Sequence, residues 1–108
     1  MKINKKLVGY FSDVIGYIDI LLELDGFDDV KEIYQNIRLV LLSWVKDYYI
    51  NKNFNNITYD ESLKIHDQLQ EIRDFKIFDN SLGMEAMITD SILIAYESVV
   101  KMINDELS

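Results

Sequence analysis

The stretch VKEIYQNIRLVLLSWVKDYYI, residues 30–50, decides the fold of this 108-residue chain. Its apolar residues recur every three or four positions, which is the period of an amphipathic α-helix. The residues that follow this period are Val30, Ile33, Tyr34, Ile37, Val40, Leu41, Trp44, Val45 and Tyr48. Apolar residues cover more than half of this helix, so we predict that it is the most buried helix or that part of it faces a partner.

Three further segments have the same period, namely about Asn4–Leu24, Asp60–Phe75 and Met84–Leu107. In the third segment the predicted buried stripe is Leu63, Ile65, Leu69, Ile72 and Phe75. Four amphipathic helices with short connections are typical of an all-α, antiparallel four-helix bundle with up-down-up-down order. A chain of this length predicts a single helical domain over residues 1–108.

The breaks between the segments contain turn residues. Asp25 and Gly26 can end the first helix, because glycine tolerates a left-handed conformation. Asp28 or Asp29 can cap the second helix, and Asp29 with Glu32 has the spacing of a capping box. Asn-rich residues 51–56 and residues 79–83 separate the remaining helices.

Composition supports helices and a reducing compartment. The chain has no proline, no cysteine and only four glycines, so disulfides and thiolate metal sites are excluded. We interpret the basic and then apolar N-terminus as a mature helix and expect a cytoplasmic protein without a membrane span. Gly9 and Gly16 share one helix face, and we expect close approach of a neighbouring helix there, or a flat docking surface.

The formal net charge of −8 limits the class of partner. It argues against nucleic acid and anionic membranes, because phosphates would be repelled. It favours a protein partner with a basic surface. The alternative is that the acidity only aids solubility.

The stretch LELDGFDDVKE, residues 22–32, gathers carboxylates around one glycine and can be tested as a calcium loop. With Gly26 at position 6 of such a loop, four acidic residues occupy ligand positions. They are Glu23, Asp25, Asp29 and Glu32. Position 1 is Leu21, which has no side-chain oxygen, so we do not expect a metal or any other cofactor.

The same stretch favours a partner-binding surface. Six acidic residues in and before the turn are opposed in the sequence only by Lys31, and a single helix cap does not need so many. They are Asp19, Glu23, Asp25, Asp28, Asp29 and Glu32. Like charges repel, so we interpret part of this cluster as serving binding.

A second group of candidate binding residues surrounds the tyrosines. Tyrosine is enriched at interfaces, and the chain has seven. We expect most to fill the core, with Tyr49 and Tyr59 the better interface candidates. The group comprises Asp47, Tyr49, Tyr59, Asp60 and Glu61.

Catalytic chemistry is not indicated. His66 is the only histidine, and a general base needs an orienting partner and a pocket. Glu71 or Gln70 could approach it from the next helical turn. The chain has no glycine-rich phosphate loop, no nucleophile elbow and no histidine zinc motif, so we do not expect an enzyme.

An acidic helical bundle without cysteine, carrying Asp47-Tyr48-Tyr49, resembles the small bacterial immunity proteins that neutralise toxins of colicin or contact-dependent inhibition systems. The colicin nuclease immunity proteins have an acidic second helix and an adjacent tyrosine pair. Ile50 follows the pair here, where that family has proline. The resemblance implies a small protein that occludes the basic active-site surface of a nuclease toxin.

Two alternatives to immunity remain open at this point. A phage-encoded inhibitor of a host nuclease would also present carboxylates in place of phosphates. A helical scaffold or oligomerisation subunit would instead expose an apolar patch for self-association, which the second helix could supply.

Overall fold

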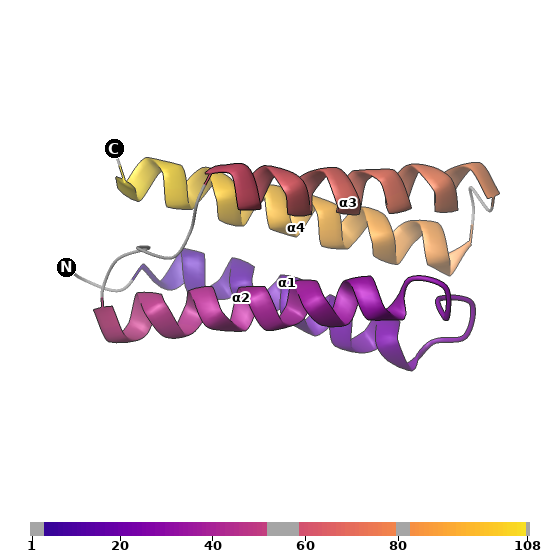
Figure 1. Cartoon of the computed structure of the whole chain (residues 1–108), viewed down its shortest axis with the longest axis horizontal. Helices are drawn as coiled ribbons and strands as arrows, with labels where there is room; N and C mark the ends of the chain where they lie inside the picture. Colours follow the sequence, from indigo (N-terminus) through magenta and orange to yellow (C-terminus); the bar gives the residue numbers. More distant parts are fainter. Residues whose placement is uncertain (1–3, 52–58, 80–82, 108) are drawn as a thin grey trace.

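The computed structural model describes residues 4–51, 59–79 and 83–107. These residues form four α-helices and no strand: α1 (Lys5–Glu23), α2 (Lys31–Asn51), α3 (Tyr59–Asp79) and α4 (Met84–Leu107). Successive helices run in opposite directions (Figure 1). The prediction of an all-α, up-down-up-down four-helix bundle is therefore confirmed.

The helix boundaries follow the sequence pattern closely, and α3 extends four residues beyond the predicted Phe75. Asn4 caps α1, because its side-chain oxygen accepts from the Lys6 amide at 2.9 Å. The capping-box prediction for the second helix is wrong. The Val30 carbonyl accepts the first intrahelical bond from the Tyr34 amide at 3.1 Å, so Asp28 and Asp29 precede the cap position.

All four helices contribute to one buried core. The apolar stripe of α1 is buried and consists of Leu7, Phe11, Val14, Ile18 and Leu21. Trp44 of α2 is among the largest buried side chains. The outer face of α2 exposes Leu39 and Ile50, so only part of its wide apolar surface is buried. In α3 the predicted stripe is wrong at both ends, because Leu63 and Phe75 are 43% and 57% exposed.

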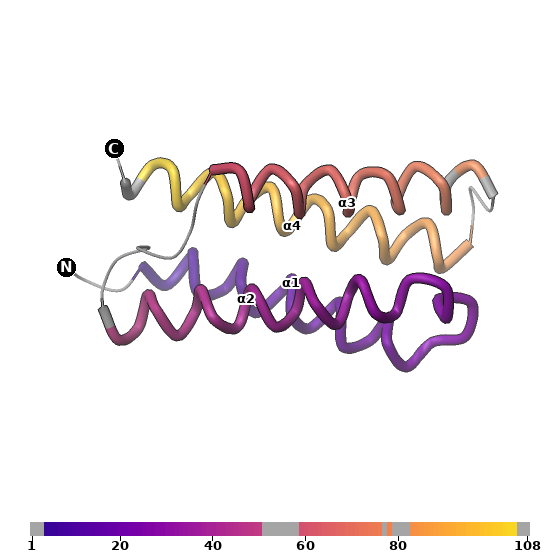
Figure 2. Tube along the Cα trace, viewed as in Figure 1, coloured from indigo at the N-terminus to yellow at the C-terminus, as the bar shows by residue number. Residues whose placement is uncertain are grey.

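The bundle measures 43 × 23 × 21 Å. One end holds the α1–α2 turn together with the end of α3 and the start of α4, and the start of α1 and the end of α4 lie at the opposite end (Figure 2). Close packing joins α1 to α2, α1 to α4, and α3 to α4. The described parts of α2 and α3 bring their backbones close together at few positions. The seam between these two helices is therefore the loosest in the bundle.

Within the described residues, no helix has both the length and the apolar composition required to cross a bilayer.

The left-handed conformation predicted for Gly26 is confirmed, whereas the prediction for Gly9 and Gly16 is wrong. An added Cβ at Gly9 or Gly16 would meet nothing within 4 Å, so the expected close approach of a helix is wrong at both positions. Gly26 has φ +94°, a conformation that L side chains rarely adopt, and its Cβ would collide with the Glu85 carboxylate. Gly26 is thus required by the turn, whereas Gly9 and Gly16 only weaken α1.

We expect opposite outcomes for alanine at these positions. Gly9→Ala and Gly16→Ala should each raise the free energy of unfolding by about 1 kcal/mol, because they remove backbone entropy from the unfolded chain. Gly26→Ala should lower it by about 1–2 kcal/mol through backbone strain. Urea unfolding followed by circular dichroism measures all three, and equal effects at Gly16 and Gly26 would contradict the assigned conformations.

Candidate functional site

The turn between α1 and α2 is anchored by Phe27. Its side chain is fully buried, although it lies outside any helix. The Phe27 carbonyl accepts a hydrogen bond from the Val30 amide at 3.0 Å, which closes the turn just before α2. The backbone of the acidic stretch is therefore fastened to the core.

Lys76 of α3 reaches the same turn from across the bundle. Its side chain is only 6% exposed, and its ammonium donates to the Gly26 carbonyl at 2.9 Å. The ammonium also lies 5.2 Å from the centroid of the Phe27 ring, 3.9 Å from Asp29 Oδ1 and 3.8 Å from Glu85 Oε2. A buried charge needs such compensation, because desolvation is costly. One cation thus ties α3 to the turn and to α4.

Three of the six predicted turn carboxylates have cations of the same chain beside them. Asp19 pairs with Arg38 at 2.7 Å, Asp28 with Lys31 at 3.1 Å, and Asp29 lies near Lys76. The prediction that Lys31 alone opposes the cluster is therefore wrong. Arg38 and Lys76 are distant in sequence from the turn. Arg38 comes close to Asp19 because α1 packs on α2, and Lys76 comes close to Asp29 because the end of α3 lies at the α1–α2 turn.

The other three, Glu23, Asp25 and Glu32, are exposed. They form no ion pair and no side-chain hydrogen bond with the part of the chain that the structure describes. These three carboxylates remain available to a partner.

The acidic character extends beyond the turn to all helix termini at this end. We define the acidic end as residues 19–32, 71–78 and 83–90, which lie together in Figure 1. It contains ten acidic residues and three basic ones, and Arg38 of α2, just outside these ranges, pairs with Asp19. The acidic residues are Asp19, Glu23, Asp25, Asp28, Asp29, Glu32, Glu71, Asp74, Glu85 and Asp90, and the basic ones are Lys31, Arg73 and Lys76. This excess of negative charge produces a directed electrostatic field, even with several ion pairs formed.

The second predicted group does not join this end. Tyr49 near the end of α2, and Tyr59, Asp60 and Glu61 at the start of α3, lie at the opposite end of the bundle. Tyr49 and Tyr59 are 42% and 73% exposed, as expected of interface residues. Asp47 is 5% exposed, so its assignment to a binding surface is wrong. The turn carboxylates and these tyrosines lie apart because α2 runs from the α1–α2 turn to the opposite end of the bundle.

The tyrosine pair also divides by burial. Tyr48 is 1% exposed and its hydroxyl accepts from the Asn4 amide at 2.7 Å, which joins the end of α2 to the start of α1. The Tyr49 ring packs edge-on against it with centroids 6.2 Å apart. Tyr48 therefore serves the fold, and only Tyr49 is presented to solvent.

The calcium arrangement considered for residues 22–32 is not formed. Among the described residues, no three carboxylate or histidine side chains are placed to hold one metal ion. The carboxylates of Asp28 and Asp29 are instead near Lys31 and Lys76.

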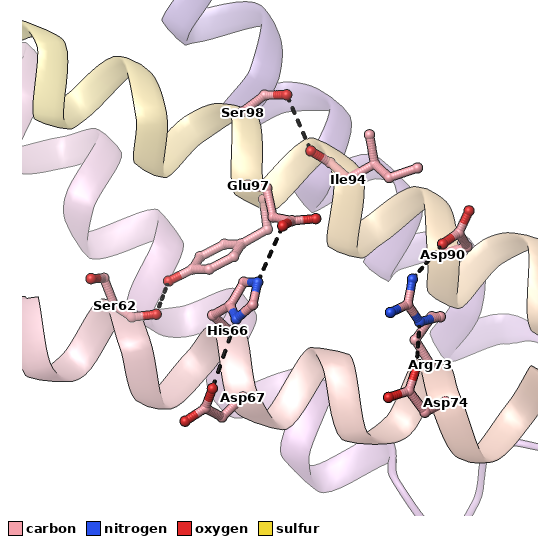
Figure 3. A network of polar contacts seen from close by, with 10 residues as sticks. Ser62, His66, Asp67, Arg73, Asp74, Asp90, Ile94, Glu97 and Ser98 are labelled. Carbon is pink, nitrogen blue, oxygen red and sulfur yellow. Dashed lines mark hydrogen bonds and ion pairs between the residues drawn. The ribbon is translucent and has the colours of Figure 1, made fainter.

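His66 lies between two carboxylates on the α3–α4 face (Figure 3). Its Nε2 is 3.3 Å from Glu97 of α4 and its Nδ1 is 3.8 Å from Asp67, so the expected approach of Glu71 or Gln70 is replaced by a contact between helices. A cavity of about 490 Å³ adjoins it. The Ser62 hydroxyl donates to the Tyr59 carbonyl at 2.8 Å and does not engage the imidazole. The expectation that His66 has no catalytic role stays a prediction.

Arg73 makes another polar contact between these helices. Its guanidinium donates to Asp90 at 3.0 Å and to Asp74 at 2.8 Å (Figure 3). The hydrogen bond to Asp90 raises the pKa of Arg73 above its ordinary value, against the opposing effect of desolvation. Asp74 and Asp90 therefore contribute to the acidic end as partly neutralised carboxylates.

A groove runs along the loose seam between α2 and α3. It consists of two cavities of about 430 and 220 Å³, both lined by Gln68. The first cavity opens beside Asp29 and Phe75, within the acidic end. The groove thus continues the acidic end along one side of the bundle, and sequence periodicity gave no indication of it.

Two buried tyrosines of the core differ in whether the hydroxyl group has a hydrogen-bond partner. The Tyr96 hydroxyl donates to the Ser62 carbonyl at 2.6 Å, whereas the buried Tyr34 hydroxyl has no hydrogen-bond partner in the described structure. Desolvation raises the pKa of both phenols above the ordinary value, with a further contribution from the charge of Glu61 at Tyr96. Both phenols are therefore neutral in the folded protein at pH 7.

We expect removal of the two hydroxyls to have different effects on the free energy of unfolding. Tyr96→Phe should lower the free energy of unfolding by about 1–2 kcal/mol, because it leaves the Ser62 carbonyl without its donor. Tyr34→Phe should be neutral or stabilising by up to about 1 kcal/mol, because it removes an unsatisfied buried group. Denaturant unfolding of both variants is the measurement, and a loss at Tyr34 as large as at Tyr96 would contradict the assignment.

Phe27 and Lys76 are the structural residues of this site that sequence analysis missed. No role was predicted for Phe27, and its only signal in the sequence is that of a large aromatic residue amid carboxylates. Lys76 follows Ile65, Leu69 and Ile72 at helical spacing, so it occupies a position that periodicity assigns to the core. A lysine at a core position beside an acidic turn could have indicated the contact.

No protein-family model, curated protein or solved structure matches the chain.

Proposed function

We propose that this protein is an acidic binding module whose acidic end docks on a positively charged surface of a partner protein. The observation that carries the proposal is the concentration of ten acidic and three basic residues in one end of the bundle. Three of these carboxylates, Glu23, Asp25 and Glu32, are exposed and not ion-paired within the described chain. Clustered like charge destabilises a fold by repulsion, and it accelerates association with a cationic surface.

Apolar side chains at the same end supply the second requirement of a stable interface. Phe75 and Phe78 of α3 are 57% and 92% exposed, and Met84 and Met87 of α4 are 66% and 69% exposed. Exposed aromatic and methionine side chains surrounded by charge are typical of contacts that slow dissociation. We assign them the role that the sequence predicted for Tyr49 and Tyr59.

The partner that we propose is a nuclease toxin, with this protein as its immunity protein. Nuclease active sites are basic, because they hold phosphates, and an acidic module seated there would exclude the nucleic acid. The resemblance in size, acidity and helical architecture to toxin-immunity proteins supports this class. A phage inhibitor of a host nuclease would use the same surface and the same mechanism.

The test is a pull-down experiment. The protein is immobilised, and it captures binding proteins from a lysate of the cells that produce it. The triple variant Glu23→Gln, Asp25→Asn, Glu32→Gln removes the unpaired carboxylates of the acidic end. A matched variant, Asp13→Asn, Asp67→Asn, Glu97→Gln, changes the net charge equally at exposed positions outside that end. Quantitative mass spectrometry compares the two with the unaltered protein.

We expect a basic protein to be retained by the unaltered and matched proteins, and about tenfold less by the triple variant, as loss of electrostatic complementarity requires. If the basic protein is a nuclease, its activity should be inhibited by the unaltered module. Equal loss with both triple variants, or no loss with either, would refute the acidic end as the binding surface.

A further inference from the structure

We propose that the α2–α3 groove binds a basic amphipathic helix of the partner. This inference rests on the proposed function, because it names the structural element that the acidic module receives. The backbones of α2 and α3 come close at fewer positions than those of the other neighbouring helices, and these two helices leave two adjoining cavities of about 430 and 220 Å³ between them.

The floor of the groove is apolar and has helical spacing. From α2 it receives Val30, Ile33, Ile37 and Val40, which recur every three or four residues. From α3 it receives Ile65, Ile72 and Phe75. Such a surface accepts apolar side chains spaced i, i+3, i+4 and i+7 along a docked helix.

The rim selects the charge of the occupant. Asp29 and Glu71 line the cavity at the acidic end, Glu61 lines the other cavity, and Lys64 is the one cation among the described lining residues. A helix with lysine or arginine beside its apolar stripe matches this rim. A second copy of this chain does not, because each copy has a net charge of −8.

The length of the groove sets the length of the ligand. From Val30 to Val40 the α2 wall extends about 15 Å at the rise of an α-helix. About three helical turns of a partner would therefore lie in contact, with further contacts from Phe75 at the acidic end.

The probe is a fluorescent peptide of about 14 residues, which has leucines at i, i+3, i+4 and i+7 and lysines elsewhere. Binding is measured by fluorescence anisotropy in about 50 mM NaCl, where screening is weak.

Two pairs of variants test whether the groove is the binding site. The double variant Ile33→Lys, Val40→Lys places cations in the groove, and the double variant Leu39→Lys, Leu42→Lys adds the same charge on the outer face of α2. A milder pair on α3 is Gln68→Lys, which lies in both cavities, and Gln70→Lys, which is exposed.

We expect saturable binding that weakens at least about tenfold in the Ile33/Val40 variant and about threefold in Gln68→Lys, with changes below about twofold in the two matched controls. A scrambled peptide of equal charge should bind at least about tenfold more weakly, because it lacks the apolar stripe. Equal losses in groove and control variants, equal binding of the scrambled peptide, or no saturable binding would overturn the proposal.

The acidic-end variant separates this proposal from the proposed function. Glu23→Gln, Asp25→Asn, Glu32→Gln leaves the groove lining unaltered, so the probe should bind it within about threefold of the unaltered protein. Peptide binding with no charge-dependent retention of a basic protein would refute the proposed function alone. Charge-dependent retention without peptide binding would refute the groove alone.

Discussion

Phe27→Ala is expected to lower the free energy of unfolding by about 3–4 kcal/mol, the largest effect that we expect of any single substitution in the α1–α2 turn. The Phe27 ring is fully buried in a segment with no helical hydrogen bonds to retain it. Its removal would leave a cavity and would also take the aromatic face away from the Lys76 ammonium. Urea unfolding followed by circular dichroism measures the change.

Phe78→Ala is the matched control for Phe27→Ala. Phe78 is 92% exposed at the same end of the bundle, so the same truncation should change stability by less than about 0.5 kcal/mol. Phe27→Leu should recover more than half of the loss, because it refills most of the volume. A Phe27→Ala protein as stable as Phe78→Ala would show that the turn is not fastened to the core.

Lys76→Ala should lower the free energy of unfolding by about 2–3 kcal/mol. Loss of the ion pairs accounts for the smaller part of this decrease in stability, because the Asp29 side chain is 62% exposed and can rehydrate when its cation is removed. The larger part comes from the buried stem and from the Gly26 carbonyl, which loses its charged donor. The measurement is again urea unfolding, at low and high salt.

Two controls separate the charge of Lys76 from its packing. Lys76→Met keeps the stem, so it should recover part of the loss while leaving the Gly26 carbonyl without its donor. Lys64→Ala removes an exposed lysine from the same helix and should cost less than about 0.5 kcal/mol. A Lys76→Ala protein that matches Lys64→Ala in stability would contradict the buried position of the ammonium.

Local periodicity was sufficient to predict the bundle. Each helix has its own apolar stripe, as in Leu7, Phe11 and Val14 of α1, and antiparallel order follows from short connections. The pattern failed where tertiary contacts override it. Leu63 and Phe75 lie off the buried face of α3, and Lys76 occupies that face because three acceptors and an aromatic ring converge on it.

The candidate site was only partly predictable for the same reason. The acidic turn is visible in residues 22–32, but its pairing with Arg38 and Lys76 depends on helices brought together by folding. The groove depends on the spacing between α2 and α3, which no single helix encodes. The separation of Tyr49 and Tyr59 from the turn follows from the direction and the length of α2.

Stopped-flow association kinetics test the central claim most directly, with the basic protein retained by the immobilised module as the ligand. We expect its association rate constant to fall at least about tenfold between about 50 and 300 mM NaCl, and to be lower and to fall less steeply with salt for the Glu23→Gln, Asp25→Asn, Glu32→Gln variant. An association rate that is independent of salt, or that is the same for both proteins, would contradict an acidic end built to meet positive charge.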